Sequence, residues 1–134
     1  MIARGDLGVE LPIYQLPVYQ RRIAEMAHKY GKPVIMATEL MKSMVKSPYP
    51  TRAEVSDVFN SVMARVDATM LSDETAVGLY PVRTVEYMAK TVKEGENEII
   101  DPHHDFELQS DDENEFLKKA LAKHALMLAD EAKA

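Results

Sequence analysis

The chain has 134 residues, 46% of them hydrophobic, which suits one globular domain or part of a larger one. It has no Cys, which excludes disulfides and thiolate metal sites, and no apolar run long enough to cross a bilayer. Ten of its 22 acidic residues lie between Glu94 and Glu115, with no Lys or Arg among them, so the net charge of −6 is local. The scattered basic residues argue against a nucleic-acid surface, and the lack of a visible signal peptide predicts a cytoplasmic location.

The first predicted unit places a strand before a helix. Residues 1–3 form a short apolar strand, and Arg4–Gly8 follows as a loop. Residues 18–30 carry apolar side chains at helical spacing, with charged side chains mostly opposite. Gly31 comes directly after them, where a helix commonly ends in a left-handed glycine. We therefore expect a strand, a loop and an amphipathic helix in that order.

The second predicted unit repeats this order. Residues 33–38 form a short apolar run behind Gly-Lys, which is typical of a strand buried on both faces. A brief helical pattern follows over residues 40–45. Thr51 and Glu54 then have the spacing of a capping box, in which each side chain bonds the other residue's backbone N–H. This predicts the start of a helix at residue 52.

The third predicted unit is followed by a change in composition. Residues 68–72 form the strand, a polar loop follows, and residues 82–94 have an apolar stripe at helical spacing. We read residues 96–114 as an acidic linker and residues 115–134 as a last helix. Residues 1–95 then make one α/β unit, with parallel strands joined by right-handed crossovers. Three strands leave edges bare, so this unit is expected to be a slice of a larger sheet or barrel.

Hydroxyls and carboxylates recur where the three strands end. In parallel α/β sheets these ends converge on one ligand crevice. Gly5 lets a backbone N–H approach an anion closely, and Asp6 offers a hard oxygen ligand to Mg²⁺. Thr38 and Ser72 can donate to a carboxylate or pass a proton, and Glu74 can orient such a hydroxyl. The set suits an anionic substrate bound with a divalent metal.

Each of these polar residues also has a purely structural interpretation. Asp6, Thr38 and Ser72 each precede a helical pattern, so each side chain is a candidate cap. For any one of them, capping is the commoner explanation. Three in succession, with a glycine loop, favour a shared site.

Four sequence strings resemble the pyruvate kinase family. They are IARGDLGVE from Ile2, GKPVIMAT from Gly31, PTRAEVSDV from Pro50 and MLSDETAVGLYP from Met70. Their order and spacing also agree with the family, and the similarity covers about residues 1–95. The helix over residues 115–134 resembles the first helix of the family's C-terminal regulatory domain.

The resemblance implies a partial (β/α)8 TIM barrel, made of about its last three βα units. The family transfers phosphate from phosphoenolpyruvate to ADP in glycolysis, giving pyruvate and ATP, and it uses Mg²⁺ or Mn²⁺ and K⁺. By position, the amides of Gly5 and Asp6 would hold the substrate carboxylate, and Asp6 would also bind the metal. Thr38 would contact the substrate, and Arg4 would brace the loop.

The resemblance also implies that Ser72 and Glu74 belong to the network that delivers a proton to the enolate. The family's catalytic Lys and second metal-binding Glu, however, lie on a strand before Met1. Glu39 stands where the family often has Gln, and Asp73 where it often has Gly or Ala.

We therefore expect a fragment with an incomplete site and negligible turnover alone. It would need a complementing N-terminal half. The alternatives are an inactive half-barrel scaffold that associates with its own copies as a homo-oligomer, and a separate anion-binding module.

Overall fold

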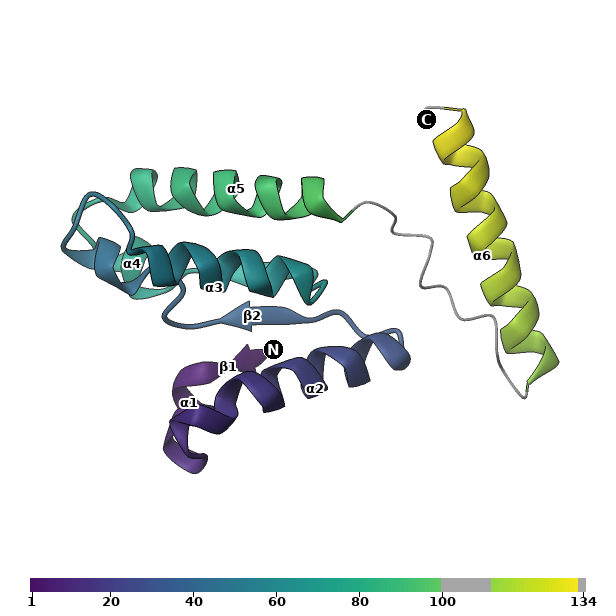
Figure 1. The fold of residues 1–134 in the computed structure, drawn as a ribbon, viewed down its shortest axis with the longest axis horizontal. Helices are drawn as coiled ribbons and strands as arrows, with labels where there is room; N and C mark the ends of the chain where they lie inside the picture. The colour runs from purple at the N-terminus through teal and green to yellow at the C-terminus, as the bar shows by residue number, and fades with distance from the viewer. Residues whose placement is uncertain (100–111, 133–134) are drawn as a thin grey trace. The chain divides into compact units, whose positions relative to one another are not determined.

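The computed structural model describes residues 1–99 and 112–132, and the first of its two units is Met1–Glu98. The described residues of this unit contain three strands, which form one sheet: β1 (Ile2–Ala3), β2 (Ile35–Ala37) and β3 (Ala68–Met70). Figure 1 labels β1 and β2. Its helices are α1 (Arg4–Glu10), η1 (Ile13–Gln15), α2 (Leu16–Lys29), η2 (Lys42–Val45), α3 (Arg52–Met63), α4 (Asp73–Ala76) and α5 (Pro81–Glu98). The alternation of strands and helices confirms the predicted α/β class.

The sheet is parallel, with β2 between β1 and β3. Ala3 lies opposite Ala37, and Ala37 lies opposite Met70. The last residues of the three strands are therefore level with one another. This register brings the segments after the strands to the same edge of the sheet, as the sequence predicted.

The hydrophobic core lies around the central strand. Met36 and Ala37 of β2 are fully buried, whereas Ile35 is 36% exposed. The prediction of a strand buried on both faces therefore holds for the end of β2 that leads into the candidate site. The buried cluster consists of Ile2, Ala24, Val34, Met36, Leu40, Met41, Met44, Val58 and Met88.

Two predicted helix boundaries are confirmed in atomic detail. Gly31 has φ +60°, its N–H bonds the carbonyl of His28, and the N–H of Lys32 bonds the carbonyl of Ala27. These two bonds make a Schellman ending for α2. Thr51 and Glu54 form the reciprocal capping box at the start of α3.

Strands β2 and β3 are shorter than predicted, α2 begins earlier, and some further segments also differ from the sequence prediction. Arg4–Gly8, expected as a loop, begins α1 directly after β1, and the polar stretch after β3 contains α4. Helix α5 continues to Glu98, beyond residue 94, where the apolar stripe placed its end. Helices α1 and α4 are 7 and 4 residues long, too short for a periodic pattern to reveal them, and nearby tertiary contacts decide their conformation.

Helices α3 and α5 pack closely, and Figure 1 shows them side by side. Gly95 on α5 is buried against Val62 on α3. A Cβ atom built on Gly95 would lie 2.9 Å from Val62 Cβ, which is closer than such atoms approach. Glycine at this position therefore sets the distance between the two helices.

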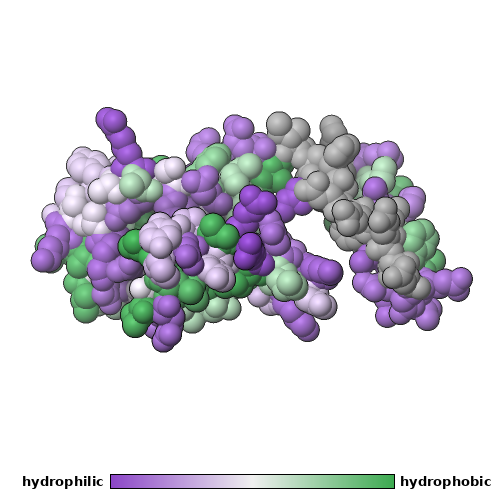
Figure 2. Space-filling view, turned by 60° about the horizontal axis from the view of Figure 1, so that its bottom comes forward, coloured by the Kyte–Doolittle hydropathy of each residue, from purple (hydrophilic) through white to green (hydrophobic). Residues whose placement is uncertain are grey.

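Hydrophobic side chains remain exposed on the face of this unit that carries α1 and α2 (Figure 2). On α2, Val18 is 50% exposed, Met26 is 55% exposed and Ile23 is 38% exposed. The apolar stripe predicted for this helix therefore forms but is only partly covered within the described unit.

The second unit spans Ile99–Ala134, and its described helix is α6 (Glu113–Glu131). An exposed ion pair joins Glu115 and Lys119 one turn apart. Most of the acidic linker predicted over residues 96–114 lies outside the described residues. Among the helices of the described ranges, none has the length and hydropathy to cross a membrane.

Candidate functional site

Arg4 links the ends of β1 and β2. Its Nε and Nη2 atoms donate hydrogen bonds to the carbonyl oxygen of Thr38, at 3.1 and 2.7 Å. Its Nη1 atom donates to the carboxylate of Asp57 on α3. Three donors of one planar guanidinium thus hold the end of β2 and the face of α3 together.

Thr38 adopts a rare backbone conformation. Its φ is +70°, and Glu39 follows with φ +55°. A left-handed conformation is unusual for a β-branched residue, and such strain persists only where surrounding contacts enforce it. In this conformation Thr38 Oγ1 accepts a hydrogen bond of 3.0 Å from the backbone N–H of Gly5. The structure therefore brings together three residues of the predicted site, Arg4, Gly5 and Thr38.

Glu74 links the ends of β2 and β3. Its side chain is buried, with 1% of the residue exposed. Oε1 accepts from the backbone N–H of Met41 at 3.2 Å, and Oε2 accepts from the backbone N–H of Ser72 at 2.9 Å. The Ser72 hydroxyl also donates to Oε2, at 3.3 Å. Ser72 and Glu74 are thus in direct contact.

The environment of Glu74 keeps its carboxylate ionised. Burial raises the pKa of this carboxyl, but hydrogen bonds from backbone N–H groups, including those of Ser72 and Met41, and from the Ser72 hydroxyl lower it by more. The pKa therefore lies below its ordinary value. At neutral pH Glu74 can only accept hydrogen bonds, so the Ser72 hydroxyl points its proton toward the carboxylate.

The capping alternative does not describe these residues. The residue at the N-cap of α1 is Ala3, and the one at the N-cap of η2 is Met41. Ser72 does occupy the N-cap of α4, but its side chain makes no capping hydrogen bond. The Thr38 hydroxyl instead accepts the N–H of Gly5 in the first turn of α1, and the Ser72 hydroxyl donates to Glu74 in α4, so neither caps the helix that follows it in the way that was weighed.

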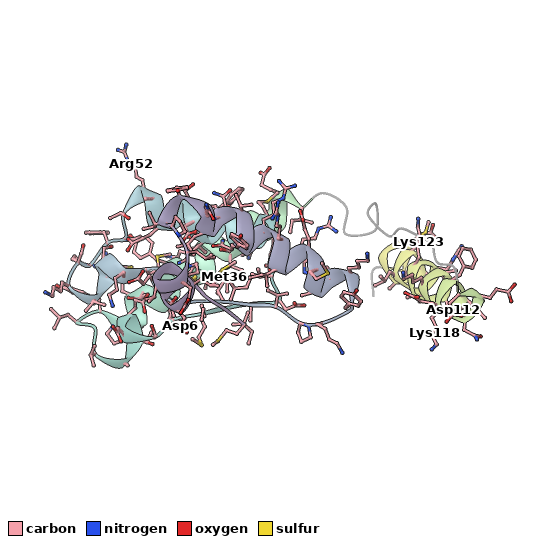
Figure 3. All side chains as sticks on the ribbon, turned by 90° about the horizontal axis from the view of Figure 1, so that it is seen from below. Asp6, Met36, Arg52, Asp112, Lys118 and Lys123 are labelled. Carbon is pink, nitrogen blue, oxygen red and sulfur yellow. The ribbon has the colours of Figure 1, made fainter. Side chains whose placement is uncertain are left out.

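Asp6 lies in the first turn of α1 and is exposed (Figure 3). Its carboxylate makes no hydrogen bond or ion pair within the described part of the chain. Mg²⁺ commonly takes one or two protein carboxylates and completes its shell with water and substrate oxygens. Asp6 fits one such ligand. Residues 1–99 and 112–132 contain no cluster of three acidic, His or Cys side chains that would hold a metal without substrate.

Two contacts of the site were missed by sequence analysis. Asp57 holds Arg4 across 53 positions, and the backbone of Met41 holds Glu74 across 33. Asp57 lies within the PTRAEVSDV string, yet nothing local in the sequence connects it to the first strand. Its position on α3, facing the end of β1, appears only once the chain is folded.

A separate apolar groove lies along α3, away from the strand ends. Its walls include Tyr49, Arg52, Phe59 and Tyr87. Arg83 lies over the ring of Tyr49, 4.5 Å from its centroid. None of the predicted site residues lines this groove, so it adds nothing to the candidate site.

The chain matches known proteins over the unit just described. Residues 1–85 match the family described as pyruvate kinase, barrel domain. Pyruvate kinase 2 of Synechocystis is 53% identical over 102 residues, which are 76% of this chain and 17% of the relative. The pyruvate kinase of Thermotoga maritima is 46% identical over 99 residues, 74% of this chain and 21% of the relative. That of Thermococcus litoralis is 53% identical over 93 residues, 69% of this chain and 20% of the relative.

These matches cover most of the chain but little of each relative. The chain spans about a fifth of the length of the curated relatives that it matches. The matched residues include all three strands and the segments that follow them.

Proposed function

The chain belongs to the pyruvate kinase family, and we propose that the ends of its three strands form one part of a site that binds phosphoenolpyruvate. One observation carries the proposal. Arg4 bonds Thr38 across β1 and β2, and Met41 bonds Glu74 across β2 and β3, so hydrogen bonds join all three strand ends. In parallel α/β sheets this edge is where substrates bind.

Gly5, Asp6 and Thr38 would receive the carboxylate of the substrate. The first turn of α1 carries the N–H groups of Gly5 and Asp6, and the Gly5 N–H would have to leave Thr38 Oγ1 to reach the substrate. Thr38 Oγ1 already accepts the N–H of Gly5, so its own proton stays available for donation. A substrate carboxylate approaching Thr38 therefore meets a hydroxyl donor of fixed position.

Ser72 and Glu74 would deliver a proton to the enolate formed when phosphate leaves. The buried carboxylate of Glu74 fixes the Ser72 hydroxyl by a charge-assisted hydrogen bond. In this step the hydroxyl would turn its own proton from Glu74 to the enolate carbon and take a replacement proton from a water molecule, while the bond from the Ser72 N–H to Glu74 keeps the residue in place.

Asp6 would supply one carboxylate to Mg²⁺ or Mn²⁺, and a bound divalent ion neutralises charge on the transferred phosphoryl group. The resemblance also implies K⁺, for which the described residues suggest no ligands. Phosphoenolpyruvate with ADP, or pyruvate with ATP, are the proposed substrates, and the cytoplasm is the proposed compartment.

The site is proposed to be incomplete within these 134 residues. The catalytic Lys and second metal-binding Glu implied by the resemblance have no counterpart among them. Electrostatic stabilisation by such groups is usually the largest catalytic contribution to phosphoryl transfer. Turnover would therefore require further polypeptide, for which a complementing N-terminal half is the direct candidate.

A coupled assay for ATP release tests this proposal. The purified chain with Mg²⁺, K⁺, phosphoenolpyruvate and ADP should show negligible turnover. Adding the N-terminal part of a pyruvate kinase should restore turnover, and the Asp6→Asn chain should fail to restore it. Full turnover by the chain alone would refute the incomplete site, and equal complementation by Asp6→Asn would refute the role of Asp6.

A self-associating scaffold is the second candidate, because the sheet is open. Within the described residues, β1 and β3 each pair on one side only, and the hydrophobic face of α2 is partly exposed (Figure 2). Unpaired strand edges are templates for association between chains. Molar mass in solution separates the two candidates. A stable oligomer that binds neither phosphoenolpyruvate nor the N-terminal half favours the scaffold. An assembly that forms only with that half favours the incomplete substrate site.

A further inference from the structure

Asp57 is a carboxylate outside the predicted site that nevertheless faces it. It lies on α3, whose start is fixed by the Thr51–Glu54 capping box. Its carboxylate accepts a hydrogen bond from Arg4, and its side chain is 33% exposed while that of Arg4 is 13% exposed. The pair is thus partly shielded from water, where a charge-assisted bond has more effect than on the surface.

The guanidinium of Arg4 has its orientation set from two sides. Two of its nitrogens donate to the single carbonyl oxygen of Thr38, and the third donates to Asp57. A planar guanidinium held at one edge by a carbonyl can still rotate about that contact. The bond to Asp57 removes this freedom, because α3 is a separate, packed element.

The carbonyl that Arg4 holds belongs to a strained residue. Thr38 and Glu39 both have positive φ, a backbone conformation that neither residue type adopts readily. Relaxation of Thr38 to an ordinary conformation would turn its carbonyl away from Arg4 and would move Oγ1 from the N–H of Gly5. Strain of this kind persists only under an external constraint, and the two hydrogen bonds from Arg4 supply that constraint.

We infer that Asp57 is a positioning residue: through the guanidinium of Arg4, it holds Thr38 in the left-handed conformation that places Oγ1 at the amide of Gly5. In this role Asp57 needs no direct contact with a substrate. The consequence for phosphoenolpyruvate rests on the proposed function, whereas the coupling of Asp57 to Thr38 does not.

The coupling is tested without any ligand by nuclear magnetic resonance on the whole chain. In Asp57→Asn, the amide signals of Gly5 and Thr38 should move, the Cα and Cβ shifts of Thr38 should leave the left-handed range, and amide exchange at Gly5 should accelerate about tenfold. Arg4→Lys should produce the same changes, because lysine cannot donate to Thr38 and Asp57 in one plane. In the double variant the changes should not add, since both act through one contact.

Asp67→Asn is the matched control. Asp67 also accepts a backbone hydrogen bond from the β2 segment, at 2.6 Å from the N–H of Val34. That bond lies at the opposite end of the strand from Thr38. The control should disturb Val34 and leave the signals of Gly5 and Thr38 in place.

A titration with phosphoenolpyruvate and Mg²⁺ then separates the inference from the proposed function. A weakening of about tenfold or more in Asp57→Asn, together with the ligand-free changes, supports both. If the ligand-free changes occur but the unaltered chain does not bind phosphoenolpyruvate, the coupling of Asp57 to Thr38 stands and the proposed function is rejected. Unmoved Gly5 and Thr38 signals in Asp57→Asn, or equal movement in Asp67→Asn, overturn the inference.

Discussion

The carboxylate of Glu74 accepts a hydrogen bond from the backbone N–H of Met41, a residue 33 positions earlier in the chain. This bond joins the segment after β2 to the segment after β3, and both partners are buried. It adds to the pairing of β2 with β3 and to the ion pair between Lys42 and Asp73, which also join the β2 and β3 sides. Glu74 therefore connects the two halves of the candidate site in addition to orienting Ser72.

Replacement of Glu74 by glutamine should destabilise the chain although the side chain keeps its size. The amide keeps one acceptor oxygen, so its NH2 group faces the backbone N–H of either Met41 or Ser72, which then lacks an acceptor. We expect a loss of about 1–3 kcal/mol in the free energy of unfolding, measured by urea denaturation. The control is Asp73→Asn, at a neighbouring carboxylate whose side chain is 57% exposed. Equal losses in the two variants would contradict a special role for the buried carboxylate.

The second prediction concerns acid. Burial raises the pKa of Glu54, but hydrogen bonds from the side chains and backbone N–H groups of Ser43 and Thr51 lower it by more, so it lies below its ordinary value of 4.5. A group whose pKa is lower in the folded state stabilises the fold above its unfolded pKa. The free energy of unfolding should therefore hold steady above about pH 5 and fall as the pH drops below 4.5 through the folded pKa.

Glu54→Gln should remove part of this acid sensitivity. Its stability at pH 7 should be lower than that of the unaltered chain, and the two curves should converge below pH 4. Glu10→Gln is the control, at an exposed carboxylate without a hydrogen bond among the described residues. Chemical denaturation between pH 3 and pH 7 measures both. A Glu54→Gln curve parallel to the unaltered one would show that the pKa shift is absent.

The third prediction compares two glycines in helices. Gly95→Ala should destabilise the chain by about 1–3 kcal/mol, because the added methyl group overlaps Val62. Gly8→Ala in α1 should stabilise it by about 0.5–1 kcal/mol, because its methyl group would meet Leu16 Cδ1 at an ordinary 3.7 Å. Thermal or urea unfolding gives both signs. Unchanged or increased stability in Gly95→Ala would contradict the close packing of α3 and α5.

The features that local chemistry decides were predictable from the sequence. Gly31 marks the end of α2, and Thr51 with Glu54 marks the start of α3, because each signal acts within one helical turn. The parallel order of the strands followed from their alternation with helices, and it placed the polar residues at one edge.

The connections within the site were not predictable in the same way. Asp57 and Arg4 are 53 positions apart, and their contact depends on how α3 packs against the sheet. The left-handed backbone of Thr38 also has no sequence signal, because threonine ordinarily avoids it. The residue types at the strand ends indicated a site, whereas the hydrogen bonds that shape it follow from tertiary packing.

We propose that the three strand ends form one substrate-binding edge with Asp6 as a metal ligand. Paramagnetic line broadening by Mn²⁺ in the presence of phosphoenolpyruvate is the sharpest test of this site. The amide signals of Gly5, Asp6, Thr38 and Ser72 should broaden only when both ligands are present, and the broadening should be lost in Asp6→Asn. Broadening confined to the acidic residues between Glu94 and Glu115, or unchanged by Asp6→Asn, would contradict it.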